Sequence, residues 1–256
     1  MTTRDTDKNQ EIMKATPETQ KELLRLQSLD TRLQQLDHAA KTLPELKTIA
    51  ALEAQLSPIR QRLAARTGAL EDARTELSRI ESDVAVVEAR IARDQQRVAA
   101  TSSMKDVQAL EQELASLRKR RSDLEDIELT VMERFEELEA EHAETVAERD
   151  AVTARIAEAE SARDAALARL RAERDEVQGE RSRLSDAFSR ELLGLYEQQR
   201  ARYGIGAALL RGGVSLASNV RLTGSDLEAV RRAAPDDIVL CPDSSAILVR
   251  TEESGL

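Results

Sequence analysis

The sequence predicts a mainly α-helical protein in which a long antiparallel coiled-coil hairpin precedes a small α+β module at the C-terminus. Three observations support this prediction. Of 256 residues, 34% are charged and only 2% are aromatic, although aromatic side chains normally bury the most area in a globular core. Nine glycines and five prolines leave few turns. Apolar residues recur every seven positions along much of the chain, and glycines gather mainly after residue 203.

The helical region is predicted to cover residues 17–203. Pro17 suits a first helical turn, where proline loses no hydrogen bond, and residues 1–16 are expected to form a disordered N-terminus. We expect a break near residue 43, because Pro44 follows a possible Thr42 cap. A second interruption is expected near residue 58, where Pro58 should kink the helix rather than end it.

Two heptad seams are separated by a short break. The first seam has apolar residues seven apart, with further apolar residues three positions later: Leu63, Leu70, Leu77, Val84, Ile91 and Val98, then Ala73, Ile80 and Val87. After the hydroxyl run at 101–103, the second seam consists of Leu110, Leu117, Leu124, Val131 and Leu138. A turn near 100–104 would pair the seams as an intramolecular hairpin. The alternative is a parallel coiled coil between chains.

The expected turn also predicts a register. If the turn centres near Ser102, the numbers of paired residues add to about 204–206, because the two arms run in opposite directions from that point. Ile91 would then lie near Leu114, and Leu63 near His142.

Residues 204–256 have a different pattern. Short apolar segments at 207–210, 238–240 and 246–249 predict strands, and 224–232 predicts a short capped helix. A module of roughly fifty residues has little core and commonly needs a metal or disulfide. We expect its core to combine these apolar residues, docked near two tyrosines: Leu209, Leu210, Ile238, Leu240, Ile247 and Val249, with Tyr196 and Tyr203.

Several segments resemble a known family. They are Gln108–Leu114, Arg121–Asp126, Gly206–Arg211, Pro235–Asp237 and Ile247–Arg250. Through them the chain resembles the bacterial C4-type zinc-ribbon proteins with an N-terminal coiled-coil hairpin, some of which act as chaperones or adaptors in flagellar and type III secretion systems. The resemblance implies that residues 204–256 form a zinc-ribbon-like domain with two Cys-x-x-Cys turns.

The family's zinc site is degenerate in this sequence. Its four positions fall on Ser215, Ser218, Cys241 and Ser244, so the two-residue spacings remain while three of the four cysteines are serine. A neutral hydroxyl is a poor zinc ligand compared with a thiolate. We therefore expect no bound metal and no cofactor. The alternative is that Ser215 and Ser218 are ordinary turn residues and the first turn aligns a residue or two away.

Charge and composition restrict the function. The net charge of -10 disfavours nucleic acid and anionic membranes. Residues 204–256 contain five basic and seven acidic residues, so this module lacks the basic surface that nucleic acid needs. The run Arg118–Arg121 is flanked by acidic residues and is expected to be solvated and salt-bridged. The single Cys241 cannot form an internal disulfide, which suits the cytoplasm.

No catalytic constellation is recognisable. No histidine accompanies Cys241 in the module, and the Gly204–Gly206 and Gly212–Gly213 segments lack the context of a phosphate-binding loop. No apolar stretch approaches the ~18 residues of a membrane span, and no signal peptide is evident. The leading hypothesis is a non-enzymatic cytoplasmic interaction protein, chaperone- or adaptor-like, that binds protein partners. A nucleic-acid-binding protein and a structural spacer are the alternatives. The sequence does not determine the oligomeric state.

Overall fold

The computed structural model describes residues 13–256. Residues 1–12, which include most of the expected disordered N-terminus, lie outside the described residues. The chain divides into two compact units. The first unit combines the described residues up to Leu43 with Asp164–Leu256, and the second unit is Pro44–Arg163. This division differs from the expected boundary at residue 204, because the first unit joins the C-terminal module to helical segments from both ends of the helical region.

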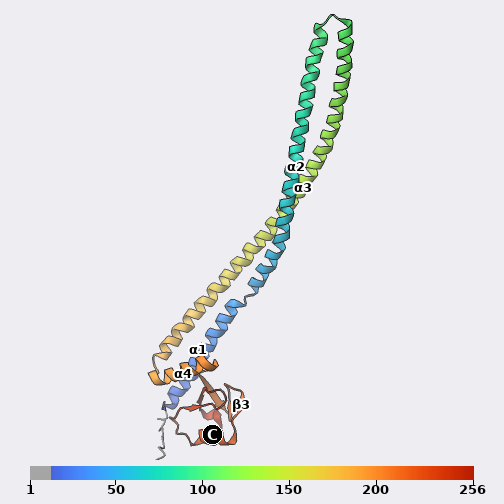
Figure 1. Cartoon of the computed structure of the whole chain (residues 1–256). Coiled ribbons are helices and arrows are strands. Elements are labelled where there is room, and N and C mark those ends of the chain that lie inside the picture. The colour runs from blue at the N-terminus through green and yellow to red at the C-terminus, as the bar shows by residue number, and fades with distance from the viewer. Residues whose placement is uncertain (1–12) are drawn as a thin grey trace, which may run out of the picture. The chain divides into compact units, whose positions relative to one another are not determined.

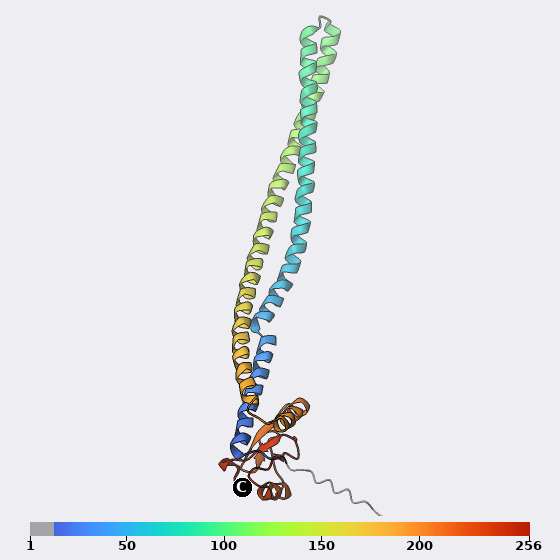
Figure 2. The same cartoon turned by 90° about the vertical axis from the view of Figure 1, so that its left-hand side faces the viewer.

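The second unit is a helical hairpin. It contains α2 (Pro44–Ala100) and most of α3 (Met104–Ser185), which lie side by side and run in opposite directions in both views (Figures 1 and 2). Residues 101–103 form the turn between them. The Ser103 hydroxyl accepts the Asp106 N–H at 3.5 Å, as a residue before a helix commonly does. The predicted helical hairpin is confirmed.

The predicted seams supply the buried residues of this hairpin. Ala73, Ile80 and Ile91 are buried on α2, and Leu110, Leu124 and Val131 are buried on α3. A separate cluster nearer the start of α2 combines Leu52, Leu56 and Ile59 with Val152, and Ile156 packs against it. The seven-residue spacing therefore identified the face of each helix that is buried.

Away from the turn, contacts between the helices differ from the predicted register by about one helical turn, whereas Arg90 and Glu113 near the turn add to 203. His142 Nε2 lies 3.2 Å from the Thr67 hydroxyl, so the paired numbers add to 209 rather than about 205. Arg134 and Glu76, at 3.9 Å, add to 210. The predicted pairing of Leu63 with His142 is therefore displaced. Residues four apart lie on the same helical face, so the apolar pattern does not distinguish two registers that differ by one turn.

The two prolines behave differently. Helix α1 (Pro17–Lys41) ends just before the Pro44 that begins α2, which is where the sequence placed a break. In contrast, α2 continues through Pro58, in agreement with the expectation that this proline does not end the helix. Proline removes one backbone hydrogen bond from a helix interior. The buried Leu56 and Ile59 pack on both sides of that position and keep the helix continuous.

The first unit contains a five-stranded sheet and four helical segments. The helices are α1, the end of α3, α4 (Arg190–Tyr203) and α5 (Gly224–Arg232). The strands are β1 (Ala207–Arg211), β2 (Val214–Ser215), β3 (Val220–Arg221), β4 (Val239–Leu240) and β5 (Ile247–Val249), in the order β3-β2-β1-β5-β4. Only β1 and β5 pair in parallel. A 3₁₀ turn, Glu252–Ser254, follows β5.

Helices cover both faces of this sheet. On one face, Leu23 and Leu26 of α1 and Leu192 and Tyr196 of α4 pack against three strand residues, Ala207, Ile247 and Val249. On the other face, Val230 of α5 packs with Leu210, Leu222, Cys241 and Leu248. The expected core was therefore right for most strand residues, but Leu240 and Tyr203 are exposed. Helix α1, which the sequence assigned to the coiled coil, therefore supplies apolar residues to the core of the module.

Residues 13–16 are ordered, in contrast to the disorder expected there. The Ala15 N–H donates to the Asp236 carbonyl at 2.8 Å, and the Ile238 N–H donates to the Met13 carbonyl at 2.9 Å. Lys14 forms an ion pair with Asp236 at 3.1 Å. Polarity predicted disorder, but backbone groups more than 200 residues away provide the hydrogen bonds that order this segment.

Candidate functional site

The two segments assigned to the degenerate metal site form turns of the same kind. In the first, the Asn219 N–H donates to the Ser215 carbonyl at 2.8 Å. In the second, the Ser245 N–H donates to the Cys241 carbonyl at 2.8 Å. Asn219 and Ser245 have φ angles of 58° and 57°, which side-chain-bearing residues seldom adopt. Two segments 26 positions apart therefore share one uncommon backbone conformation.

The turns converge on the Cys241 thiol. Cys241 is 1% exposed, and Ser215 is fully buried beside it. Burial raises the pKa of the thiol. The hydroxyls of Ser215 and Ser244 and the backbone N–H groups of Ser244 and Asp243 lower it by more than burial raises it, so the pKa lies below its ordinary value. Three of the four predicted site residues thus lie together.

The donor set does not fit zinc. Ser218 is half-buried, and its hydroxyl accepts the Val220 N–H at 3.3 Å. The Ser244 Oγ is buried and has no hydrogen-bond partner among the described residues. Across residues 13–256, no group of three or more His, Cys, Asp or Glu side chains is placed to hold a metal ion. One thiol with neutral hydroxyls lacks the thiolate and imidazole ligands of structural zinc.

A buried polar network at the base of the helices was not predicted. The Asp30 carboxylate, 1% exposed, accepts hydrogen bonds from Arg181 Nε and from the Tyr196 hydroxyl, each at 2.6 Å. Arg200 lies 3.3 Å from the same carboxylate. Burial, and then the hydrogen bond to Asp30, raise the pKa of Tyr196 well above its ordinary value. The network joins α1, α3 and α4, so it stabilises the platform on which the sheet packs.

Gln27 extends this network to the sheet. Its Oε1 accepts the Gly206 N–H at 2.7 Å and lies 3.2 Å from the Tyr196 hydroxyl. Gly206 precedes β1 and must be glycine, because a Cβ there would lie 2.5 Å from the Tyr196 ring. This contact was not predictable from the sequence, since Asp30 and Gln27 look like ordinary polar positions on a charged helix.

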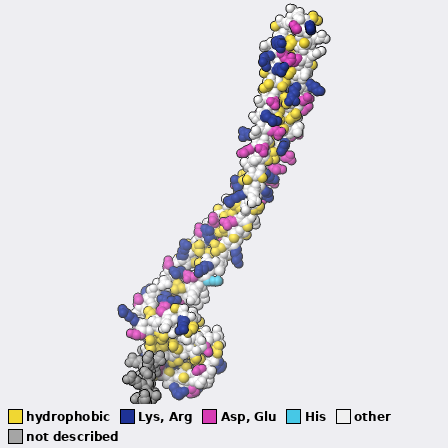
Figure 3. Space-filling view, viewed as in Figure 1, with side chains coloured by type: hydrophobic (Ala, Val, Ile, Leu, Met, Phe, Trp, Pro, Cys, Tyr) yellow, Lys and Arg dark blue, Asp and Glu magenta, His cyan; other side chains and the backbone are white. Residues whose placement is uncertain are grey.

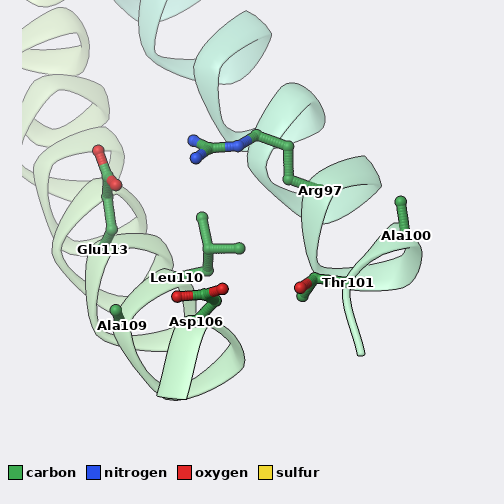
Figure 4. A pocket seen from close by; sticks show the side chains of 7 residues that line it. All are labelled: Arg97, Ala100, Thr101, Asp106, Ala109, Leu110 and Glu113. Carbon is green, nitrogen blue, oxygen red and sulfur yellow. The ribbon is translucent and has the colours of Figure 1, made fainter. Parts of the chain in front are cut away.

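A pocket lies beneath the turn of the hairpin (Figure 4). Arg97, Ala100 and Thr101 line it from α2 and the turn, and Asp106, Ala109, Leu110 and Glu113 line it from α3. Asp94, one turn before Arg97, is a buried seam residue. Its Oδ1 accepts a hydrogen bond from Arg97 at 3.1 Å, while its Oδ2 has no hydrogen-bond partner among residues 13–256. An acidic residue three positions after the seam residue Ile91 was the signal that could have identified this feature.

The basic run on α3 is mostly unpaired. Arg121 pairs with Glu125 at 3.1 Å and with Glu88 at 4.0 Å. Arg118, Lys119 and Arg120 are exposed, and within the described part of the chain none of them forms an ion pair. The run is solvated, as expected, but among the described residues only Arg121 of the four forms ion pairs; Asp123 lies within one turn of Lys119 and Arg120 and pairs with neither.

Known proteins share this architecture. The family described as the CT398-like coiled coil hairpin domain matches residues 26–204. The uncharacterized protein Rv2229c of Mycobacterium tuberculosis is 36% identical over 241 residues, which cover 94% of this chain and 98% of that protein. A solved structure from Mycobacterium smegmatis is 37% identical with a TM-score of 0.82, and the match covers 93% of this chain and 100% of that one. CT398 from Chlamydia trachomatis is 19% identical with a TM-score of 0.61, over 91% and 98% of the two chains.

The class of protein is thus a helical hairpin joined to a small curled C-terminal sheet. The chain belongs to the CT398-like coiled-coil hairpin family. The predicted coiled-coil hairpin family is confirmed, whereas these relatives give no support to the zinc-ribbon or secretion-chaperone parts of the resemblance. In addition, none of the helices within residues 13–256 combines the length and apolar character needed to cross a membrane.

Proposed function

We propose that the protein is a non-enzymatic, chaperone- or adaptor-like protein of the cytoplasm that binds protein partners through its hairpin and its C-terminal module. The observation that carries this proposal is the exposure of large apolar side chains outside the hairpin seam. Leu129 is 60% exposed, Met132 is also exposed one turn away, and Val86 is 63% exposed. Exposed apolar groups that gather on a surface favour contact with another protein.

The C-terminal module supports a second part of the proposal. We infer a zinc-ribbon-like domain that has lost its metal, because two turns of the same uncommon conformation face each other across a single remaining thiol. In place of a metal, the first unit has the Asp30 network and the apolar residues of α1 and α4 to hold the sheet. The module would then contribute a contact surface rather than a metal-dependent fold.

Site-specific photo-crosslinking tests the interaction function. A photoreactive amino acid at Leu129 should crosslink to protein partners in living cells, and nuclease treatment should not remove the adducts. The same probe at Ala51, an exposed small residue of α2, is the control. Adducts that nuclease abolishes would instead indicate nucleic-acid binding. If no adducts formed at Leu129, at Ala51 or at the exposed Leu216 of the module, the result would favour a structural spacer.

Metal analysis tests the second part. The purified protein should contain far less than one zinc per chain, and a chelator should leave its melting temperature unchanged. Substituting Ser215→Cys, Ser218→Cys and Ser244→Cys together should create a tight zinc site if the two turns descend from metal-binding ones, and Cys at only two of the three positions should bind more weakly. Stoichiometric zinc in the unaltered protein would contradict the proposal. A triple variant that binds no zinc would show that the first turn is misassigned.

A further inference from the structure

We propose that one side of the hairpin near its turn is a docking surface for an acidic amphipathic helix of a partner protein. This surface, here called the arginine stripe, consists of Val86, Arg90, Arg93 and Arg97 on α2, with Arg120 and Ile127 on α3. The inference rests on the proposed interaction function, and it specifies where a partner binds and what chemistry the partner has.

Helical spacing places the α2 residues on one face. Val86, Arg90, Arg93 and Arg97 follow one another at intervals of four, three and four, which keeps them within one narrow band of the helix. Val86 is 63% exposed, and the three arginine side chains project into solvent around it. The band covers about 17 Å along the helix, which matches roughly three turns of a partner helix.

The α3 residues lie on the same side of the hairpin. Glu113, Arg120 and Ile127 are seven apart and therefore share one face of α3. Glu113 forms an ion pair with Arg90 and lines a pocket together with Arg93 and Arg97. Because that contact joins the two bands, Arg120 and the exposed Ile127 continue the surface of α2 onto α3.

The stripe is positively charged within an acidic protein. Residues 86–127 as a whole contain eight basic and eight acidic residues, but the faces that form the stripe carry Arg90, Arg93, Arg97 and Arg120 against Glu113 and Asp123, whereas the whole chain carries -10. Figure 3 shows Lys and Arg side chains around the end of the hairpin that carries the turn. Within residues 13–256, Arg93 and Arg120 form no ion pair. Such a charge would attract an acidic partner selectively.

The composition of the stripe favours protein over nucleic acid. Val86 and Ile127 are exposed apolar side chains, which a phosphate backbone would not bury but an amphipathic helix would. Residues 86–127 contain no aromatic side chain on which a base could stack. Glu113 lies among the arginines and would repel phosphates. Arginine guanidinium groups pair well with the carboxylates of Asp and Glu.

Fluorescence anisotropy with the full-length protein tests the stripe. The probe is a fluorescein-labelled synthetic helix with Leu at every third and fourth position and Glu at most others. Arg93→Glu with Arg120→Glu should weaken its binding about tenfold, since two attractive contacts become repulsive. The matched control is Arg74→Glu with Arg155→Glu, which reverses two exposed, unpaired arginines elsewhere in the second unit and should change binding less than twofold. Circular dichroism checks that both variants remain folded.

Four outcomes would contradict the proposed docking surface. The first two are no binding of the probe to the unaltered protein and equal losses of affinity in the two double variants. The others are equal binding of a peptide with Ser in place of Leu, and displacement of the probe by polyuridine RNA at a phosphate concentration lower than the concentration of unlabelled peptide that displaces it. The photo-crosslinking experiment separates this inference from the proposed function. Protein adducts at Leu129 that persist unchanged in Arg93→Glu/Arg120→Glu would contradict the arginine stripe as the docking surface and would still support the interaction function.

Discussion

Removing the Asp30 carboxylate should destabilise the first unit strongly. In Asp30→Ala, Arg181 and Arg200 lose the carboxylate that they both contact, and the Tyr196 hydroxyl loses its 2.6 Å acceptor. The guanidinium of Arg181 would remain largely buried, with Glu197 as its remaining partner. Breaking a buried ion pair by removing one member typically costs about 3–5 kcal/mol.

The magnitude translates into a measurable shift. With a denaturant slope of about 2 kcal/mol per molar urea, a loss of about 3–5 kcal/mol lowers the unfolding midpoint by about 1.5–2.5 M. Both tyrosines of the chain, Tyr196 and Tyr203, belong to the first unit, and the chain has no tryptophan. Intrinsic tyrosine fluorescence therefore reports the unfolding of that unit.

The control is Asp37→Ala on the same helix. Asp37 pairs with Arg174 at 2.9 Å, but both side chains are about half exposed, so its removal should cost less than about 1 kcal/mol. Equal midpoints for Asp30→Ala and Asp37→Ala would refute the reasoning, because they would mean that the Asp30 network is not desolvated.

Three further predictions concern the hairpin and the thiol. Ile80→Asp should lower the melting temperature clearly, because it buries an unpaired carboxylate, whereas the neighbouring exposed Glu81→Ala should change it little; equal effects would contradict the seam. Cysteines substituted at Thr67 and His142 should crosslink within one chain at high dilution, and crosslinks only between chains would contradict the intramolecular hairpin. Ser215→Ala should raise the pKa of the Cys241 thiol, because it removes a hydroxyl that stabilises the thiolate. Absorbance at 240 nm as a function of pH measures this pKa, and an unchanged titration midpoint would show that the Ser215 hydroxyl does not interact with the thiol.

The helical architecture was predictable because its causes are local. Leucines seven apart define a buried face, a run of hydroxyl residues ends a helix, and proline begins one. These signals identified the turn at 101–103 and the helix at 224–232. The register was less predictable, since a shift of one turn leaves the same faces in contact. Contacts between the helices, such as Thr67 with His142 and Glu76 with Arg134, distinguish the two pairings.

The candidate sites show the same division. The family resemblance, with its two-residue spacings, placed the paired turns around Cys241, and such turns form locally because each is set by a few consecutive residues. The arginine stripe required the pairing of two helices, which the ion pair of Arg90 with Glu113 supplies. Asp30 and residues 13–16 could not be assigned from the sequence, since their partners lie more than 150 positions away. The sequence by itself determined the long helices with their buried faces, the turn between them, the helix at 224–232 and three of the five strands, but not β2, β3 or the break between α3 and α4. Tertiary structure decided which distant polar groups meet, because the free energy of a buried charge depends on neighbours that only folding brings together.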